Sequence, residues 1–342
     1  MDKIKVVGGT PLRGDIEVAG AKNAALPVMA SSLMGPEALT LTNIPELRDV
    51  ATMASLLRSM GVSISRSQSI MTLTAKDLKE VEAPYEMVKT MRASILVLGP
   101  LVARLGEARV SLPGGCAIGA RPINLHLAGL ERMGADVRID HGYVHVKAKR
   151  LKGTSIYLDM PTVTGTENLM MAAVLADGIT TIENAACEPE VADLADSLNV
   201  RGANVRGAGG RVITVTGVSS LTAGEHAVIP DRIEAGTFLA AGAITRGDLF
   251  VRNARPSDME ALLVKLKEAG VRLDIDAKGI RVRATGPLCS VDITTLPYPG
   301  FPTDMQAQLM ALMSTAKGLS VITETNLLNR AELQRYFRLG SP

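Results

Sequence analysis

Apolar residues recur every three or four positions in several stretches of the chain, as in helices that bury one face. The clearest stretch is 45–60, where Leu47, Val50 and Met53 follow this spacing and Gly61 comes directly after. A glycine there is typical of a helix C-terminus. The same pattern predicts helices at Lys22 to about Met34, Val88–Leu105 with an interruption near Gly99-Pro100, Pro122–Met133, Glu188–Asn199, Ser257–Glu268, Met305–Lys317 and Ala331–Arg338.

Short segments in which apolar and polar residues alternate lie between these helices, as expected for strands with one buried face. Most of them come in pairs that read as hairpins after a helix-ending glycine. The predicted strands are Ile4–Val6, Ile16–Val18, Ser63–Ser65, Ile70–Thr74, Arg109–Leu112, Asp136–Ile139, Tyr143–Val146, Asn204–Arg206, Val212–Val215, Arg272–Ile275 and Ile280–Val282.

The helix-ending glycines themselves repeat along the chain. Gly61, Gly134, Gly202, Gly270 and Gly340 recur about every 70 residues, too far apart for a helical solenoid. Each period holds two helices and several strands, so we predict about five small α/β subdomains. A single α/β fold with helices of similar length is the alternative. The fifth period stops after its glycine, which predicts either a naturally short chain or a truncated one.

Length and composition favour two well-packed domains. The chain has 342 residues, of which 46% are hydrophobic and 21% charged, values typical of globular proteins. Aromatic residues make up only 3%, there is no tryptophan, and 16 methionines are available to fill gaps in an aliphatic core.

Charge and cysteine content exclude several classes of protein. The formal net charge is +2 with no basic run, which argues against a nucleic-acid partner. The N-terminus lacks the apolar stretch of a signal peptide, and the longest apolar run, 93–103, is too short to span a bilayer. Three cysteines without metal-like spacing are typical of reduced thiols, so we expect a cytoplasmic protein.

One loop, 111–122, carries the most unusual chemistry. Two glycines precede Cys116, Arg121 follows it, and prolines flank the group. A lone cysteine is usually a small buried hydrophobe. Here the glycines permit close approach to a ligand and the arginine offers an anion-binding fork. The residues leave open whether Cys116 donates a proton or acts as a nucleophile.

Other cations suggest an anionic substrate. Lys22 and Asn23 stand after a glycine at a helix start, where free N–H groups and the helix dipole favour anions. Arg92, Arg121 and Arg232 could add positive charge, although each alone is more often solvated. The motifs of nucleotide triphosphatases and dinucleotide enzymes are absent from the sequence. The four histidines are interpreted as helix-face or strand-surface residues.

A second unusual loop, 297–304, contains three prolines and ends in Thr303-Asp304 before a predicted helix. Thr303 or Asp304 could cap that helix. Asp304 could also be a carboxylate at a site edge that accepts a proton from a substrate hydroxyl, and the two interpretations are compatible.

Taken in order, these motifs resemble the UDP-N-acetylglucosamine 1-carboxyvinyltransferase family of enolpyruvyl transferases. The Cys116 loop and the Phe301-Pro-Thr-Asp-Met-Gln segment are the most specific. The matching stretches are Ala19-Gly-Ala-Lys-Asn-Ala-Ala, Met91-Arg-Ala-Ser, Pro113-Gly-Gly-Cys-Ala-Ile-Gly-Ala-Arg-Pro, Thr166-Glu-Asn-Leu-Met-Met-Ala-Ala, Pro230-Asp-Arg-Ile-Glu-Ala-Gly-Thr, Phe301-Pro-Thr-Asp-Met-Gln-Ala-Gln and Ile322-Thr-Glu-Thr.

The resemblance implies an α/β fold of two domains, an inside-out α/β barrel of repeated βαβαββ subdomains, with the last of six subdomains missing here. It implies one lobe made of 1–19 with 230–342 and a second lobe, 20–229, that carries the Cys116 loop. The implied reaction transfers enolpyruvyl from phosphoenolpyruvate to the 3′-hydroxyl of UDP-N-acetylglucosamine and releases phosphate, without metal or cofactor. This reaction belongs to peptidoglycan precursor synthesis, and so to cell-wall biogenesis and cell division.

The resemblance also implies roles for individual residues. Cys116 would be the general acid and the fosfomycin target, and Asp304 would take the hydroxyl proton. Lys22 and Asn23 would bind phosphoenolpyruvate, and Arg121 its phosphate. The residues that would hold the UDP-sugar or line the cleft between the lobes are Arg92, Arg121, Pro122, Ile123, Asn124, Leu125, Thr162, Val163, Thr164, Gly165, Asn326 and Arg330.

The family pattern fades after Thr325, and Cys187 stands where the family usually has arginine. A truncated, inactive relative that binds UDP-sugar as a regulatory or interaction module is therefore the alternative function. The related shikimate-phosphate enolpyruvyl transferases lack the cysteine loop, which disfavours them.

Overall fold

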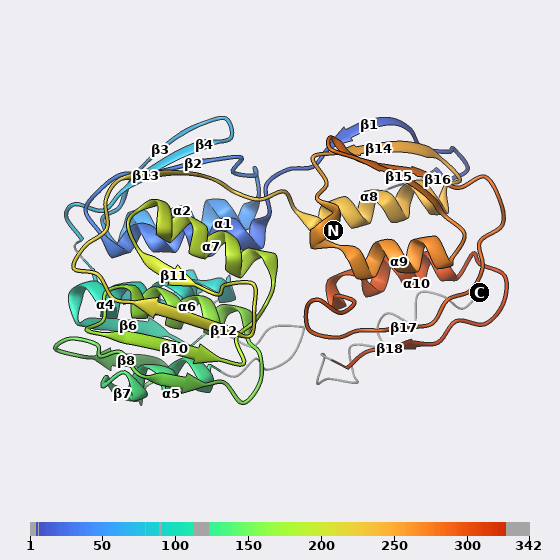
Figure 1. The fold of residues 1–342 in the computed structure, drawn as a ribbon. Coiled ribbons are helices and arrows are strands. Elements are labelled where there is room, and N and C mark those ends of the chain that lie inside the picture. The colour runs from blue at the N-terminus through green and yellow to red at the C-terminus, as the bar shows by residue number, and fades with distance from the viewer. Residues whose placement is uncertain (1–4, 6, 79, 89–90, 113–122, 326–342) are drawn as a thin grey trace. The chain divides into compact units, whose positions relative to one another are not determined.

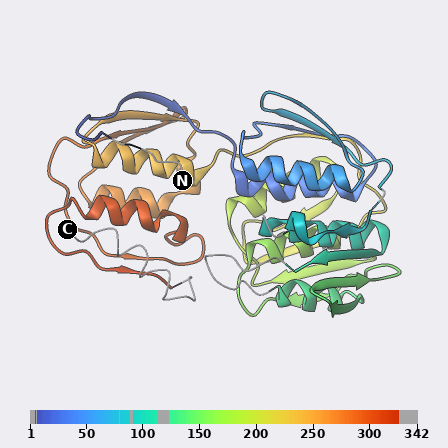
Figure 2. The same cartoon turned by 180° about the vertical axis from the view of Figure 1, so that it is seen from behind.

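The computed structural model describes residues 5, 7–78, 80–88, 91–112 and 123–325. The described residues divide into two compact units, one of 20–229 and one of 5–19 with 230–325. Figures 1 and 2 show the elements of each unit from opposite sides.

The unit 20–229 contains three four-stranded sheets with the helices packed against them. Its helices are α1 (Lys22–Ala30), η1 (Ser31–Met34), α2 (Arg48–Ser59), α3 (Tyr85–Val88), η2 (Arg92–Val97), α4 (Leu98–Leu105), α5 (Asn124–Arg132), α6 (Val163–Val174) and α7 (Pro189–Val200). Its strands are β2 (Leu39–Thr42), β3 (Ser63–Ser67), β4 (Ile70–Thr74), β5 (Glu82–Ala83), β6 (Glu107–Ser111), β7 (Asp136–Asp140), β8 (Tyr143–Lys147), β9 (Ser155–Tyr157), β10 (Ile179–Glu183), β11 (Asn204–Arg206), β12 (Val212–Thr216) and β13 (Gly224–Ala227).

The other unit has one four-stranded sheet and one strand pair, with α8, α9 and α10 between them (Figure 1). Its helices are α8 (Arg232–Ile244), η3 (Pro256–Asp258), α9 (Glu260–Glu268), η4 (Thr303–Met305) and α10 (Gln306–Met313). Its strands are β1 (Arg13–Glu17), β14 (Asp248–Arg252), β15 (Arg272–Asp276), β16 (Gly279–Arg283), β17 (Ile293–Thr294) and β18 (Ile322–Thr323).

The predicted repeat is visible in the sheets. The four-stranded sheets have the orders β13-β2-β4-β3, β5-β6-β8-β7, β9-β10-β12-β11 and β1-β14-β16-β15. In each, the first pair is parallel and the other two pairs are antiparallel. Every sheet in the described part is open, so the barrel of the prediction is not a closed sheet.

In two of these sheets, the first strand comes from a part of the chain that adjoins the other unit. Strand β1 precedes α1 in sequence, yet it pairs with β14 in the other unit. Strand β13 precedes α8, yet it pairs with β2. Each unit therefore takes one strand from the part of the chain next to the other unit.

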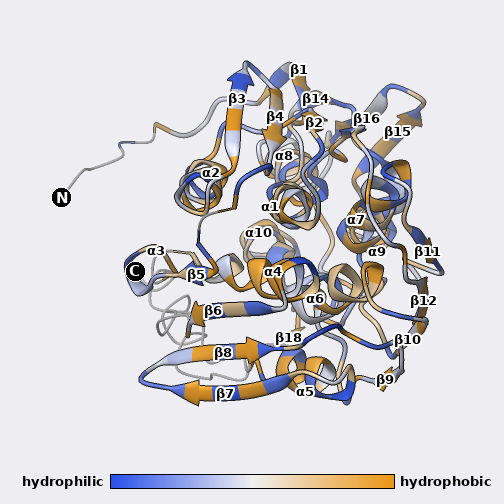
Figure 3. Ribbon diagram, turned by 90° about the vertical axis from the view of Figure 1, so that its left-hand side faces the viewer, coloured by the Kyte–Doolittle hydropathy of each residue, from blue (hydrophilic) through white to orange (hydrophobic). Residues whose placement is uncertain are grey.

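The core of each unit is aliphatic and consists largely of helices. In α1, residues 24–30 are all buried, and in α6 residues 165–174 are all buried. The outer strands alternate instead, and Figure 3 shows hydrophilic and hydrophobic residues along β7 and β8. None of the helices in the described residues is long and apolar enough to cross a membrane.

The predicted helix ends are largely confirmed. Gly61, Gly134, Gly202 and Gly270 all have φ between +88° and +101°, the left-handed region that glycine adopts without strain. Gly340, the predicted helix 331–338 and most of the strand predicted at 4–6 lie outside the described residues.

Several helix predictions were wrong in detail; the helix predicted to run to Lys317 ends at Met313, and the helix predicted from Ser257 begins at Glu260. The predicted helix 88–105 changes from η2 to α4 at Val97, whereas Gly99-Pro100 lies inside the first turn of α4. Proline is tolerated there because first-turn N–H groups have no intrahelical acceptor. The helix predicted from Pro45 begins at Arg48.

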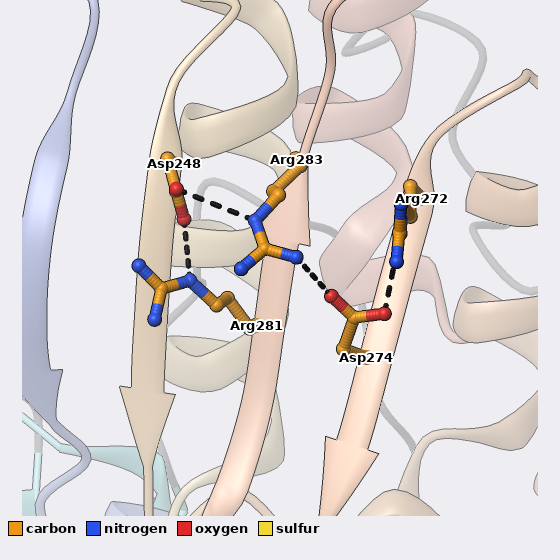
Figure 4. A network of polar contacts seen from close by, with 5 residues as sticks. All are labelled: Asp248, Arg272, Asp274, Arg281 and Arg283. Atoms are coloured by element: carbon orange, nitrogen blue, oxygen red, sulfur yellow. Dashed lines mark hydrogen bonds and ion pairs between the residues drawn. The ribbon is translucent and has the colours of Figure 1, made fainter.

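The solvent face of the sheet β1-β14-β16-β15 carries a network of ion pairs (Figure 4). Asp248 accepts from Arg281 Nε at 2.5 Å and from Arg283 Nε at 3.3 Å. Asp274 links Arg283 to Arg272 on the neighbouring strand. The hydrogen bond from Arg281 holds the pKa of Asp248 below its usual value. Because the network is solvated, it fixes strand register more than it stabilises the fold.

Arg201 is a fully buried arginine at the end of α7. It directly precedes Gly202, at the position that Met60, Met133 and Ala269 occupy before the other helix-ending glycines, and all four are 0% exposed. Its Nη1 donates to Ser31 O at 2.9 Å and its Nε to Thr222 O at 3.3 Å. Among the described residues it forms no ion pair, and Nη2 has no hydrogen-bond partner. Burial lowers the pKa of Arg201 to about 10.

Candidate functional site

Helix α1 begins at Lys22, directly after a backbone arrangement that only glycine allows. A Cβ on Gly20 would lie 1.8 Å from Asn43 O. Ala21 N donates to Ile229 O at 2.7 Å, which fixes the start of the helix beside the end of β13. No side chain caps α1 within the described residues. The helix start therefore presents N–H groups and a positive dipole end beside Lys22 and the exposed Asn23.

Lys22 is held by a carboxylate that the sequence analysis missed. Its Nζ lies 3.1 Å from Asp49 Oδ2, in the first turn of α2, and the two side chains are 40% and 39% exposed. A partly solvated pair of this kind adds little stability. Its effect is to fix where the ammonium group lies. Asp49 could not be singled out from sequence because first-turn acids are common helix residues.

Part of the predicted UDP-sugar site, residues 123–125 and 162–165, comes together at the N-termini of α5 and α6. Ile123 is the N-cap of α5, and the exposed Asn124 opens that helix with Leu125. Thr162 caps α6, because its Oγ1 accepts from Gly165 N at 3.3 Å. A Cβ on Gly165 would lie 2.3 Å from Thr162 Cγ2, so the turn 162–165 requires glycine at its end.

His126 joins these two helix starts, and the sequence analysis had interpreted it only as a helix-face residue. It is 2% exposed. Its Nε2 lies 3.5 Å from Thr164 Oγ1, and its Nδ1 lies 3.1 Å from Asn168 Nδ2. Burial lowers the pKa of His126 to about 4. An imidazole in this position is therefore neutral at physiological pH.

The lowered pKa of His126 predicts a pH-dependent stability. In the unfolded chain the histidine binds its proton with a pKa of about 6.5. The contribution of neutral His126 to the free energy of unfolding is therefore complete above that pH and is lost as the pH falls toward 4. The full effect is about 3 kcal/mol. Urea unfolding at pH 7.5 and 4.5 should show a smaller loss of stability for His126→Gln than for the unaltered chain. Equal losses in both proteins would contradict the prediction.

Asp304 lies in η4 and is exposed. No side-chain hydrogen bond caps η4 or α10 in the described residues, so the helix-cap interpretation of Thr303 and Asp304 was wrong. Thr303 instead donates to Glu324 Oε1 at 3.2 Å. Asp304 therefore caps neither helix in the described part of the chain. Arg232, the first residue of α8, lies 5.5 Å from the ring centre of Tyr298 in the same unit.

Several predicted residues cannot be placed. Cys116, Arg121 and Pro122 lie outside the described residues, as do Asn326 and Arg330. Arg92 is the first residue of η2, which contacts both α1 and α6. The structure therefore brings one part of the predicted UDP-sugar site together and leaves the Cys116 loop as a prediction.

Two further titratable groups have a shifted pKa. Glu167 is completely buried, and burial, with the charges of Glu190 and Glu188, raises its pKa well above the usual value. Cys187, where the resemblance predicts an arginine, is half-buried, and burial raises the pKa of its thiol. No cluster of three possible metal ligands is present in the part of the chain that the structure describes.

Comparisons with known proteins agree on one family. The model of the EPSP synthase (3-phosphoshikimate 1-carboxyvinyltransferase) family matches residues 6–338. A UDP-N-acetylglucosamine 1-carboxyvinyltransferase of Desulfatibacillum aliphaticivorans is 57% identical over all of this chain and 82% of its own length. One from Koribacter versatilis is 54% identical, over all of this chain and 80% of its own length.

Solved structures share the fold. The enolpyruvyl transferase NikO from Streptomyces tendae superposes with a TM-score of 0.82 at 23% identity, covering 96% of this chain and 79% of that one. An EPSP synthase from Acinetobacter baumannii gives a TM-score of 0.70 at 21% identity, covering 92% and 74%.

Proposed function

Because the chain belongs to the EPSP synthase family of enolpyruvyl transferases, we propose that it transfers enolpyruvyl from phosphoenolpyruvate to the 3′-hydroxyl of UDP-N-acetylglucosamine, releasing phosphate. The resemblance predicted from the motifs is confirmed, as is the fold. The observation that carries the choice of acceptor is the 57% identity, across the whole chain, to a relative named for that substrate. The inactive-relative hypothesis is not favoured over it.

The reaction requires two proton transfers and a place for negative charge. The 3′-oxygen of the sugar bonds to C2 of phosphoenolpyruvate while its proton goes to a base and C3 receives a proton. Loss of phosphate and of a C3 proton then restores the double bond. Acid and base groups therefore have to lie on either side of the reacting carbons, and cations have to hold the phosphate and carboxylate.

The residues of this chain supply these groups in the following way. Lys22 and Asn23, at the open start of α1, bind phosphoenolpyruvate together with Arg121. Cys116 donates the C3 proton, and Asp304, which caps no helix, accepts the hydroxyl proton. The turn 162–165 and the start of α5 bind the UDP-sugar with Arg92. Asn326 and Arg330 contribute to substrate binding.

The cellular setting follows from the reaction. The product of the proposed reaction is a peptidoglycan precursor, so the enzyme acts in cell-wall biogenesis, cell shape and cell division, in the cytoplasm. Cys116 is the residue that fosfomycin modifies. The two domains of this proposal are 1–19 with 230–342, and 20–229.

Phosphate release measures this activity directly. With both substrates present we expect release that requires each of them, and a loss of at least about 10²-fold in Cys116→Ala because the proton donor is gone. Cys289→Ala is the matched control, since Cys289 is exposed and outside the proposed site. Replacing UDP-N-acetylglucosamine with 3-phosphoshikimate should abolish release. Binding of UDP-N-acetylglucosamine without any Cys116-dependent release would favour the inactive relative.

A further inference from the structure

Asn168 is a buried polar residue whose orientation is fixed by the backbones of two other helices, η2 and α4. It is 1% exposed and lies on α6. Its Oδ1 accepts from Gly99 N at 2.5 Å, and its Nδ2 donates to Ile95 O at 2.8 Å. Because one backbone donor and one backbone acceptor hold the amide, its oxygen and nitrogen cannot be exchanged without losing both bonds.

This orientation fixes the tautomer of His126. The Asn168 Nδ2 group that faces His126 Nδ1 at 3.1 Å can only donate, so Nδ1 is the acceptor. The ring proton is then on Nε2, which points to Thr164 Oγ1 at 3.5 Å. A proton on both nitrogens would place two donors face to face. The neutral state that burial favours is thus also the one that the hydrogen bonds require.

The tautomer in turn fixes the hydroxyl of Thr164. Because Nε2–H donates to Oγ1, the hydroxyl proton of Thr164 must point elsewhere. Thr164 is half-buried, in the first turn of α6, where the helix dipole favours an anion. A ligand group that can only accept hydrogen bonds can bind the Thr164 hydroxyl when its proton points outward from this turn. The diphosphate oxygens of a nucleotide sugar are such acceptors.

We propose that His126, set by Asn168, is a positioning residue that directs the Thr164 hydroxyl to donate to the diphosphate of the UDP-sugar. The proposal rests on the proposed function, because it deepens the assignment of the turn 162–165. It gives the chain a buried series of hydrogen bonds, from the backbones of η2 and α4 through Asn168 on α6 to His126 on α5. This series acts on nucleotide affinity and does not touch the reacting carbons.

The variants at position 126 separate the two contacts. His126→Asn places an amide near Nδ1 and keeps a contact with Asn168, whereas His126→Gln places its amide nitrogen near Nε2 and can still donate to Thr164. We expect His126→Asn to raise the KM for UDP-N-acetylglucosamine about tenfold, the size expected for one lost hydrogen bond to a charged group. The KM for phosphoenolpyruvate should stay within about twofold, and His126→Gln should recover most of the affinity.

Direct binding distinguishes a failure of this proposal from a failure of the proposed function. Calorimetric titration with UDP-N-acetylglucosamine needs no turnover. If the unaltered chain does not bind it, the proposed function fails. If the chain binds and His126→Asn binds equally well, the positioning role is overturned. In a cycle with Thr164→Val, the two losses should not add, because both remove the same interaction; additive losses would also overturn it.

A matched control excludes a general effect of losing a buried histidine contact. His226 on β13 hydrogen-bonds Asp193 at 2.9 Å and its side chain is 10% exposed, but it lies outside the proposed site. His226→Gln should leave both KM values unchanged. Unfolding measurements on each variant confirm that it is folded before kinetics are compared. Equal rises in both KM values for His126→Asn would indicate a structural role alone and would contradict the proposal.

Discussion

Replacement of Lys22 by methionine is expected to lower kcat/KM by about 10²- to 10³-fold, the usual loss when a group that stabilises developing charge is removed. The ammonium of Lys22 is placed by Asp49 at 3.1 Å and stands at the open start of α1. Phosphoenolpyruvate is densely anionic, so most of the loss should appear in its KM and in kcat. Steady-state phosphate release with each substrate varied in turn measures both.

Stability provides the control for this prediction. Because the two side chains of the pair are 40% and 39% exposed, Lys22→Met should change the free energy of unfolding by less than about 1 kcal/mol. Asp49→Asn keeps the cation but frees its position, so its kinetic loss should be smaller than that of Lys22→Met. Full activity of the Lys22→Met variant would contradict the assignment of Lys22 to the site.

Replacement of Arg201 by alanine is expected to reduce the stability of the unit 20–229 by about 3 kcal/mol or more, through the cavity left in a fully buried position. Arg201→Met should stay within about 1 kcal/mol of the unaltered chain. Methionine fills the equivalent positions 60 and 133, both 0% exposed, and a buried charge can often be replaced by a hydrophobic residue without loss. Urea unfolding of the three proteins measures the difference.

The comparison also tests what the guanidinium contributes. It donates to Ser31 O and Thr222 O, and those carbonyls lose a donor in both variants. If Arg201→Met were as unstable as Arg201→Ala, these hydrogen bonds and not the filled volume would hold the end of α7. Met133→Ala, at the equivalent position of the neighbouring repeat, gives the cost of a cavity alone.

The sequence allowed the repeat to be predicted because its signals are local. A glycine such as Gly134 ends a helix whatever surrounds it, and its positive φ is a property of a few residues. Helices α6 and α8 were missed because they lack an exposed polar stripe of regular spacing. In α6, residues 165–174 are all buried, so periodicity cannot appear. The pairing of β1 with β14 depends on tertiary contacts and could not be read from either strand.

In the candidate site too, features with local sequence signals were predicted and features that depend on tertiary contacts were missed. Lys22 was found from its place at a helix start, which is a local feature, whereas Thr162 came from the family resemblance alone, because helix α6 was missed. Asp49 and Asn168 were missed because their roles depend on partners brought near by the fold. His126 was interpreted as a helix-face residue from its neighbours in the sequence, whereas its burial between α5 and α6 determines its protonation state. The motif pattern therefore indicated which chemistry to expect, and the packing showed which side chains position it.

The exchange of β1 and β13 has a consequence for the protein during synthesis. The strand β1 leaves the ribosome early, but its partner β14 ends at Arg252. At roughly 5–20 residues per second, β1 waits for tens of seconds with an unpaired edge. The unit 20–229, whose own borrowed strand ends at Ala227, can close first. The nascent chain therefore holds its first segment unpaired until residue 252 has emerged, and chaperones have that interval in which to bind it.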